Sequence, residues 1–416
     1  MERVIFHCDL NSFFASVELL DYPELRHLPV AVCGDPASRH GIILAKNEPA
    51  KKFGVKTAET IWQAKKKCPE LVLLASHHDL YREYSKKVNA IYEQYTDLVE
   101  PFGIDESWLD VTGTVHLFGG DPRAMADRIR NHVRSELGLT LSVGVSFNKI
   151  FAKLGSDYKK PDATTVIRPE DIQTMVWPLP VTDLLFVGRA AARELERYGV
   201  TTIGQLAAFD RQALGLLLGR QGYVLHDYAN GLEHSPVQPA GTYTPPKSVG
   251  NGLTFPHNLA GEEQVRSGVT LLADCVAQRL RRHALKCTGI QVSVRSPEFH
   301  DLSRQRKLSS PTFVTPELAD AAMDLIRANW NLSAPIRAIT ITAILLIPAE
   351  QAGGQMDLFS QDSFSRLQER REQLGHAMDD IRSRFGEHAI GPASQLSGHS
   401  PERSQTIPPP KFHQEA

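Results

Sequence analysis

The feature that most restricts the fold of this chain is the alternation of short apolar runs with helical patterns over residues 1–165. Runs rich in Val, Ile and Leu predict strands, whereas apolar residues at three- and four-residue spacing predict helices. The predicted strands are residues 4–8, 30–33, 42–45, 71–74, 98–102, 108–111, 141–145 and 164–167. The predicted helical segments are residues 23–25, 61–68, 80–95 and 123–137. This alternation indicates an α/β or α+β domain.

The pattern changes after residue 165. Residues 166–232 hold short helical runs separated by glycine turns, which predicts a small helical domain. Residues 233–247 are rich in proline and polar residues, as is typical of a linker between domains. Residues 248–348 predict a second β/α domain, and residues 349–416 form a tail. In the second β/α domain we predict helices at 262–286 and 316–329 and strands at 290–295, 304–308 and 336–347.

Length and composition limit the classes of protein to consider. The 416 residues are enough for about two to four domains. No apolar run approaches the roughly 20 residues that span a bilayer, and the N-terminus has no features of a secretory signal. We therefore expect no membrane association and a cytoplasmic location. The five cysteines form no CxxC pair, which argues against a disulfide framework and a zinc site and fits a reducing compartment.

The distribution of charge is more informative than the net charge of −2. Residues 277–310 contain eight Lys and Arg against two acids. Such a stripe is either the solvated face of a helix or a surface that binds a polyanion.

Three acids carry the strongest chemical signal. Asp9 ends a predicted strand, and Asp105 and Glu106 occupy a turn between two apolar strands. Adjacent acids repel each other unless a cation neutralises them, and Mg²⁺ prefers hard oxygen ligands of this kind. Two such ions would serve nucleotidyl transfer. The alternative is that Asp105 and Glu106 are ordinary turn residues and Asp9 only caps a strand.

Three segments then resemble, in order and spacing, the signature segments of the Y-family DNA polymerases. They are residues 9–18, residues 103–111, and residues 142–153 with their continuation to 161. The resemblance covers about residues 1–348 and is to the bacterial branch of the family. It implies an α+β right-hand polymerase: a palm in 1–165 with small fingers inserted at about 21–76, a helical thumb in 166–232 and a little finger in 248–348. It also implies template-directed translesion DNA synthesis of low fidelity, without proofreading.

The resemblance assigns roles residue by residue. It makes Asp9, Asp105 and Glu106 the catalytic ligands of two Mg²⁺ ions, with the backbone carbonyl of Leu10 as a further ligand. Asn11 stands where some relatives have a second Asp, and the metal site does not depend on it.

Two further residues match positions that contact the incoming nucleotide. Phe14 matches the steric gate, whose aromatic face leaves no room for a 2′-hydroxyl; the alternative is a plain core aromatic. Lys160 matches the triphosphate lysine of the palm, where a point charge suits a phosphate.

Residues 47–56 resemble the fingers segment that contacts the triphosphate, but with departures. Glu48 stands where many members have Tyr, and Lys51 where they have Arg. We keep Lys51 as a phosphate contact and exclude Glu48, because an acid beside a triphosphate is repulsive unless it points away or pairs with a lysine. We therefore expect a weaker or rearranged fingers clamp, since lysine does not replace a bidentate arginine.

DNA-binding residues are expected in both the thumb and the little finger. Residues 183–204 resemble a helix-hairpin-helix, which offers backbone N–H groups to a DNA phosphate. We assign Gly188 to this contact, although Phe186 replaces the usual first glycine, and an ordinary helical turn is the alternative. In the little finger the basic stripe adds salt-dependent binding. The arginines we select there are Arg279, Arg282, Arg295, Arg304 and Arg306.

The tail contains a recruitment motif. Residues 355–359 resemble the pentapeptide that binds bacterial sliding clamps, with Gln355 for hydrogen bonds and Leu358 and Phe359 as apolar anchors. Residues 363–386 then predict an amphipathic helix that either docks on the little finger or remains a solvated appendage.

Three other functions were weighed: a nucleotide cyclase, a weakly active or inactive paralogue that recruits other proteins to DNA, and a structural DNA-binding protein. The first needs no thumb or clamp motif, the second need not keep the acidic triad, and the third needs neither Phe14 nor Lys160. The favoured interpretation is a monomeric polymerase whose partners are primer-template DNA, dNTPs and a sliding clamp.

Overall fold

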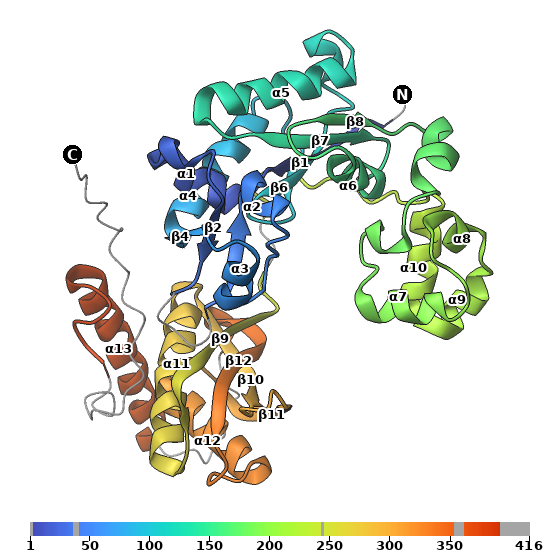
Figure 1. Ribbon diagram of the computed structural model, residues 1–416. Helices are drawn as coiled ribbons and strands as arrows, with labels where there is room; N and C mark the ends of the chain where they lie inside the picture. The colour runs from blue at the N-terminus through green and yellow to red at the C-terminus, as the bar shows by residue number, and fades with distance from the viewer. Residues whose placement is uncertain (1–2, 36–40, 243–244, 353–361, 392–416) are drawn as a thin grey trace, which may run out of the picture. The chain divides into compact units, whose positions relative to one another are not determined.

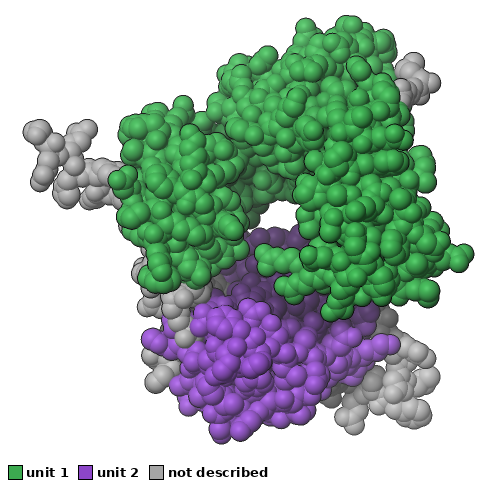
Figure 2. Space-filling model, turned by 45° about the vertical axis from the view of Figure 1, so that its right-hand side comes forward, with its two compact units in different colours: residues 1–243, 407–416 green, residues 244–406 purple. Residues whose placement is uncertain are grey.

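The computed structural model describes residues 3–35, 41–242, 245–352 and 362–391. They form two compact units, which Figure 2 colours separately, and the division falls between residues 243 and 244. That position lies within the stretch that the sequence indicates as a linker. Among the described residues, no helix is both long enough and apolar enough to cross a membrane.

The first unit is built on a five-stranded sheet with the strand order β5-β6-β1-β7-β8. β1 lies at its centre, pairs antiparallel with β6 and β7, and is buried along its whole length. A central strand of this kind is covered on both faces, which explains its largely apolar sequence. The strands are β1 (Ile5–Leu10), β5 (Val99–Pro101), β6 (Glu106–Asp110), β7 (Leu141–Ser146) and β8 (Thr164–Val166).

Helices cover both faces of this sheet, and Figure 1 shows α5 and α6 on opposite sides of it. On one face, α4 and α5 share a core with Phe6 and Cys8 of β1. On the other, α6 approaches β7 so closely that a Cβ on Gly144 would lie 1.8 Å from the carbonyl oxygen of Ala152. Because side chains alternate along a strand, residues 7 and 9 of β1 face α6. The elements around the sheet are α1 (Phe13–Asp21), α4 (His78–Tyr92), the 3₁₀ turn η2 (Val115–Phe118), α5 (Pro122–Leu137) and α6 (Lys149–Tyr158).

A smaller three-stranded sheet, of order β3-β2-β4, lies in the segment expected to form the fingers and has a core of its own. Asn47 joins β3 to the short helix α2. Its side-chain oxygen accepts hydrogen bonds from the backbone N–H of Ala50 and of Val30, and so caps α2 and ties it to β2. The elements are η1 (Pro23–Leu25), β2 (Val30–Cys33), β3 (Ile43–Lys46), α2 (Glu48–Lys52), α3 (Ile61–Lys67) and β4 (Val72–Ala75).

The rest of the first unit is helical, as the glycine-punctuated sequence predicts. Short helices enclose one apolar core, to which the first turn of α6 contributes Ile150 and Phe151. The elements are η3 (Pro169–Asp171), η4 (Ile172–Val176), η5 (Val181–Asp183), α7 (Arg189–Glu196), α8 (Ile203–Ala208), α9 (Arg211–Leu218) and α10 (Arg220–Ala229).

The second unit is a four-stranded antiparallel sheet of order β11-β10-β12-β9. Two helices, α11 and α12, pack against it and share its main core. The sequence predicted both helices and three of the strands, but not β9. The elements are β9 (Ser248–Leu259), α11 (Glu262–Arg282), β10 (Leu285–Arg295), β11 (Asp301–Thr312), α12 (Thr315–Asn329), β12 (Ile336–Pro348) and η6 (Ala349–Gln351).

The tail helix α13 (Asp362–Phe385) docks on the second unit, beside α11 in Figure 1. The sequence left open whether this helix is docked or solvated. The ion pair between Arg382 and Asp274 is almost completely buried, with 2% and 3% of the two side chains exposed. Ion pairs that join α13 to the rest of the unit are Arg382–Asp274 at 2.6 Å, Arg281–Asp379 at 2.6 Å, Lys286–Glu372 at 2.8 Å and Arg371–Glu317 at 3.6 Å.

Candidate active site

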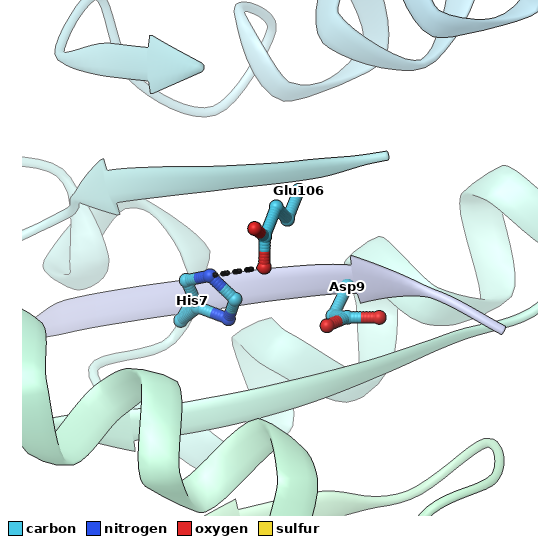
Figure 3. A group of neighbouring side chains, drawn as sticks. All are labelled: His7, Asp9 and Glu106. Atoms are coloured by element: carbon cyan, nitrogen blue, oxygen red, sulfur yellow. Dashed lines mark ion pairs between the residues drawn. The ribbon is translucent and has the colours of Figure 1, made fainter. Parts of the chain in front are cut away.

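The strand register brings the three predicted acids together. Asp9 of β1 lies directly opposite Glu106 of β6, so both side chains are on the face that meets α6. Asp105 immediately precedes β6, and its carbonyl oxygen accepts a hydrogen bond from the backbone N–H of Leu10 at 3.0 Å. The two segments that carry the acids are almost a hundred residues apart in the chain, and β1–β6 pairing alone makes them neighbours. Figure 3 shows Asp9 and Glu106 beside His7.

Glu106 is held in its ionised form. Burial raises the pKa of this carboxyl, but its close contacts with His7 and Lys153 outweigh burial and lower the pKa to about 2. Lys153 Nζ lies 2.5 Å and His7 Nε2 lies 3.4 Å from the same carboxylate oxygen, Oε2. Glu106 therefore carries a negative charge throughout the physiological pH range.

Asp105 is in the opposite situation. Burial and the negative charges of Asp9 and Glu106 raise the pKa of Asp105 to about 6. Asp9 has a cationic partner in Lys160, whose Nζ lies 2.7 Å from Oδ2. Although burial lowers the pKa of Lys160, the attraction of Asp9 raises it further, so the lysine stays charged. Lys153 and Lys160 pair with Glu106 and Asp9, so the negative charge of Asp105 is the one that these two lysines do not neutralise.

This arrangement fits a divalent cation. Ligand atoms of His7, Asp9 and Glu106 all lie within 4.8 Å of one another. Carboxylate oxygens in a partly buried site are the hard ligands that Mg²⁺ prefers. Burial first, and then the negative charges of Asp9 and Glu106, raise the pKa of Asp105, and a bound cation would relieve the repulsion among the three acids.

His7 was missed by sequence reasoning. It is fully buried, its Nδ1 is 2.8 Å from Ser156 Oγ of α6, and burial lowers its pKa. The signal that could have found it is the two-residue period of a strand, which places residue 7 on the same face as Asp9. Its contact with Glu106 makes it a residue that orients this carboxylate.

Phe14 lies in the first turn of α1 and is only partly buried, whereas its neighbour Phe13 is in the core. The Phe14 ring stacks on Tyr81 of α4, with centroids 4.1 Å apart and planes inclined by 11°. The stacked ring is thus fixed in place while part of it stays accessible, which a plain core aromatic would not be.

Glu48 and Lys51 pair with each other at the fingers. Lys51 Nζ lies 2.5 Å from Glu48 Oε1, and Ser12 Oγ donates a hydrogen bond to the same oxygen at 3.3 Å. The acid that departs from the family pattern therefore has a lysine partner in the structure.

In the hairpin before α7, Phe186 stands where the family pattern has glycine, yet its backbone adopts a conformation that is typical of glycine. Phe186 has a φ of 70°, the left-handed region that favours glycine, and its side chain is 53% exposed. Gly188 is the N-terminal cap of α7, and no atom lies within 4 Å of the position that its Cβ would take. Residues 184–188 also line a cavity of about 310 Å³ with Lys153 and Asp157 of α6.

The arginines of the second unit that we predict to bind DNA lie on different elements and have different partners. Arg304 and Arg306 oppose Val292 and Ile290 across the strands, so they share the helix side of the sheet and contact α12. Arg295 pairs with Asp301. The face away from the helices instead carries polar side chains that oppose one another across β10 and β11: Gln291, Gln305, Ser293 and Ser303.

Two further arginines lie near the end of α11. Arg279 donates to the carbonyl oxygen of Gly250 at 2.8 Å, and Arg282 is exposed. The predicted clamp-binding residues, Gln355, Leu358 and Phe359, lie outside the described residues.

Comparison with known proteins identifies the family. Residues 8–157 match the model of the impB/mucB/samB family, and residues 246–358 match the model of that family's C-terminal domain. The chain belongs to the impB/mucB/samB family. Its two family segments fall on either side of the boundary between the two compact units.

Relatives of this impB/mucB/samB protein align over almost its whole length. DNA polymerase IV of Acetivibrio thermocellus is 47% identical over 390 residues, which cover 94% of this chain and 96% of the relative. DNA polymerase IV 1 of Bacillus subtilis is 37% identical and covers 95% of this chain and 93% of the relative. A solved Y-family DNA polymerase chimera superposes with a TM-score of 0.73 at 23% identity, covering 83% of this chain and 99% of that one. The resemblance to Y-family polymerases and the α+β right-hand fold that it implies are therefore confirmed.

Proposed function

We propose that this chain is a DNA-directed DNA polymerase that carries out low-fidelity translesion synthesis. The observation that carries the proposal is the convergence of Asp9, Asp105 and Glu106 at one end of the β1–β6 pair, in a chain whose relatives are DNA polymerases IV. A polymerase of this family depends on divalent metal.

We assign the metal to residues already in place. Asp9, Asp105, Glu106 and the backbone carbonyl of Leu10 would hold two Mg²⁺ ions, which would activate the primer 3′-hydroxyl and neutralise the triphosphate when bound. His7 and Lys153 hold the Glu106 carboxylate in one orientation through their contacts with Oε2. Preorientation of this kind lowers the reorganisation that the site must undergo as charge develops.

The residues around the triad account for nucleotide binding. Lys160 pairs with Asp9 in this structure. When a metal ion neutralises Asp9, the ammonium group of Lys160 would be free to bind a phosphate oxygen instead. Lys51 supplies a second cation from the fingers. Phe14, fixed by its stack on Tyr81, would lie under C2′ of the incoming sugar and exclude a 2′-hydroxyl.

The remaining residues bind DNA and a partner. We assign phosphate contacts to the backbone at Gly188 and to the arginines of the second unit, Arg279, Arg282, Arg295, Arg304 and Arg306. Gln355, Leu358 and Phe359 would bind a sliding clamp. We further propose that the enzyme works as a monomer in the cytoplasm, which holds the DNA of its bacterial relatives.

Primer extension tests the proposal. The wild type, with Mg²⁺ and four dNTPs on an undamaged template, should give short distributive products, and Asp105→Ala should give none while still binding DNA. Asp110→Asn, at the other end of β6, is the matched control and should extend normally. Extension by Asp105→Ala would refute the metal assignment. DNA binding without extension by the wild type would favour the recruitment paralogue instead.

A further inference from the structure

One tryptophan stands out by its exposure. Trp62 lies in the first turn of α3, and 71% of its side chain is accessible to solvent. The other tryptophans are buried or partly buried, and each donates its ring N–H to a backbone carbonyl: they are Trp108, Trp177 and Trp330. Among the described residues, Trp62 has no such partner. A single exposed apolar side chain is ordinary on a protein surface, so the meaning of Trp62 depends on what accompanies it.

Lysines dominate the segment that contains Trp62. Residues 46–70 hold seven lysines and three acids. Two of those acids are already paired with lysines, in the pairs Glu48–Lys51 and Glu59–Lys67. The exposed lysines that form no ion pair within the described part of the chain are Lys52, Lys56, Lys65 and Lys66. This surface therefore carries an excess of positive charge, which attracts a polyanion.

The helix and the turn before it form one continuous, fixed surface. Thr60 Oγ1 accepts a hydrogen bond from the backbone N–H of Gln63 and so caps α3. Lys67 Nζ donates to the carbonyl oxygen of Gly54 at 3.0 Å, which ties the last turn of α3 to the turn after α2. Phe53, the residue before Gly54, is 51% exposed and adds a second aromatic side chain. We refer to the exposed side chains of residues 52–66 as the α2–α3 surface.

Positive charge and an aromatic ring meet at Trp62. Lys66 follows Trp62 by one helical turn, and its Nζ lies 5.5 Å from the centroid of the indole ring. A nucleotide offers both groups that such a pair can bind, a flat base for the indole and a phosphate for the ammonium.

Two other occupants fit the α2–α3 surface less well. A protein partner could cover an exposed tryptophan, but the cores of protein–protein interfaces are depleted in lysine. Double-stranded DNA would satisfy the lysines, but its bases are stacked on one another and offer no free face to the indole of Trp62. An unpaired strand offers both phosphates and free bases.

We propose that the α2–α3 surface binds single-stranded DNA, with a base stacked on Trp62 and phosphates on the neighbouring lysines. A polymerase carries single-stranded template ahead of the primer end, and the bound strand is this part of the template. The identification of the strand as template rests on the proposed polymerase function. The binding of single-stranded DNA rests on the α2–α3 surface alone.

Tryptophan fluorescence tests the binding of a single strand. A thymidine oligonucleotide of about 12 residues, without a primer, should quench the emission of the wild type, because a base stacked on an exposed indole quenches it. The same oligonucleotide should quench Trp62→Phe much less, since the remaining tryptophans are not exposed. A blunt duplex of the same length should leave the emission of Trp62 unchanged.

Lys66→Met keeps Trp62 as the reporter and tests the charge. Its affinity for the oligonucleotide, measured by quenching, should fall severalfold. The slope of log K against log salt should become shallower by about 0.7, the amount for one phosphate contact on a single strand. Lys86→Met, which removes an exposed lysine of α4, is the matched control and should leave the slope unchanged.

Primer extension tests whether the bound strand is the template. On a template that overhangs the primer by about ten nucleotides, Trp62→Ala should raise KM for DNA at least about fivefold, the lower end for loss of one stacked aromatic. On a template that ends one nucleotide beyond the primer, the same variant should keep the KM of the wild type. Leu117→Ala is the control, because Leu117 is a 68% exposed side chain of η2, and it should change KM on neither template.

The outcomes separate the levels of the argument. If the oligonucleotide does not quench the wild type, quenches Trp62→Phe equally, or is matched by the duplex, the α2–α3 surface is not a single-strand site. If quenching occurs but Trp62→Ala changes KM equally on both templates, or on neither, the bound strand is not the template. If the wild type is quenched but does not extend a primer, the proposed function fails and the single-strand site stands.

Discussion

Asp105→Asn should stabilise the metal-free enzyme while abolishing its activity. Burial, and then the charges of Asp9 and Glu106, raise the pKa of the Asp105 carboxyl in the native state from the ordinary 3.8 to about 6. At about 1.4 kcal/mol per pKa unit, ionising this group in the folded protein costs up to about 3 kcal/mol. Solvent screening of a partly exposed carboxyl reduces the value, so we expect a gain of about 1–3 kcal/mol for the neutral amide.

The sign of the pH dependence follows from linkage. The folded state takes up the Asp105 proton at about pH 6 and the unfolded state only near 3.8. The stability that the protonated carboxyl contributes is therefore complete below pH 3.8 and is lost as the pH rises to 6 and above. Asp105→Asn does not titrate. Its advantage over the wild type should be largest at pH 7.5, smaller at pH 5 and absent near pH 4.

Urea unfolding in EDTA, at pH 7.5 and pH 5, measures this difference. Asp110→Asn, on the same strand, is the control and should not gain stability at high pH. Added Mg²⁺ should stabilise the wild type by mass action and have a smaller effect on Asp105→Asn. The reasoning is refuted if Asp105→Asn is no more stable than the wild type at pH 7.5, or if its advantage does not change with pH.

Three further perturbations test other parts of the molecule. Phe14→Ala should admit ribonucleotides, measured as the ratio of kcat/KM for dNTP and rNTP; an unchanged ratio would exclude the gate. Deletion of residues 355–359 should spare basal extension and remove stimulation by an added sliding clamp, and stimulation that persists would place the clamp contact elsewhere. Arg382→Met leaves the buried Asp274 carboxylate without its cation and should destabilise the docked α13 by about 3–5 kcal/mol, seen as faster proteolysis within residues 362–391. Asp274→Leu added to Arg382→Met should restore most of that stability, whereas unaltered proteolysis of Arg382→Met would show that the pair does not hold the helix.

Most strands of the first unit could be predicted because each is a short apolar run. The strand at 30–33 is β2 with the same bounds, and the other predicted strands differ from the structure by at most two residues at either end. The failures have a physical cause. Residues 13–21 form α1, but this apolar segment lacks the clear period of an amphipathic helix because it is buried on most sides. β9 contains Gly250, Gly252 and Pro256, which disfavour a strand, and it persists because it is at the edge of its sheet.

The candidate site was predictable in its acids but not in its electrostatics. Sequence motifs located Asp9, Asp105, Glu106 and Lys160. They did not indicate that His7 and Lys153 share one oxygen of Glu106, or that Asp105, unlike the other two acids, forms no ion pair within the described part of the chain. Such contacts join residues from different strands and helices, and neither spacing nor composition reports them.

The sequence by itself determined most strands of the first unit, the family and the candidate metal-binding acids, because these depend on local apolar patterns and on contiguous motifs. Only the tertiary structure decided which charges compensate one another. Arg281 and Lys286 belong to the basic stripe, yet acids of α13, a helix almost a hundred residues further along the chain, pair with both. A charge acts through distance, and distances between remote segments exist only after the chain has folded.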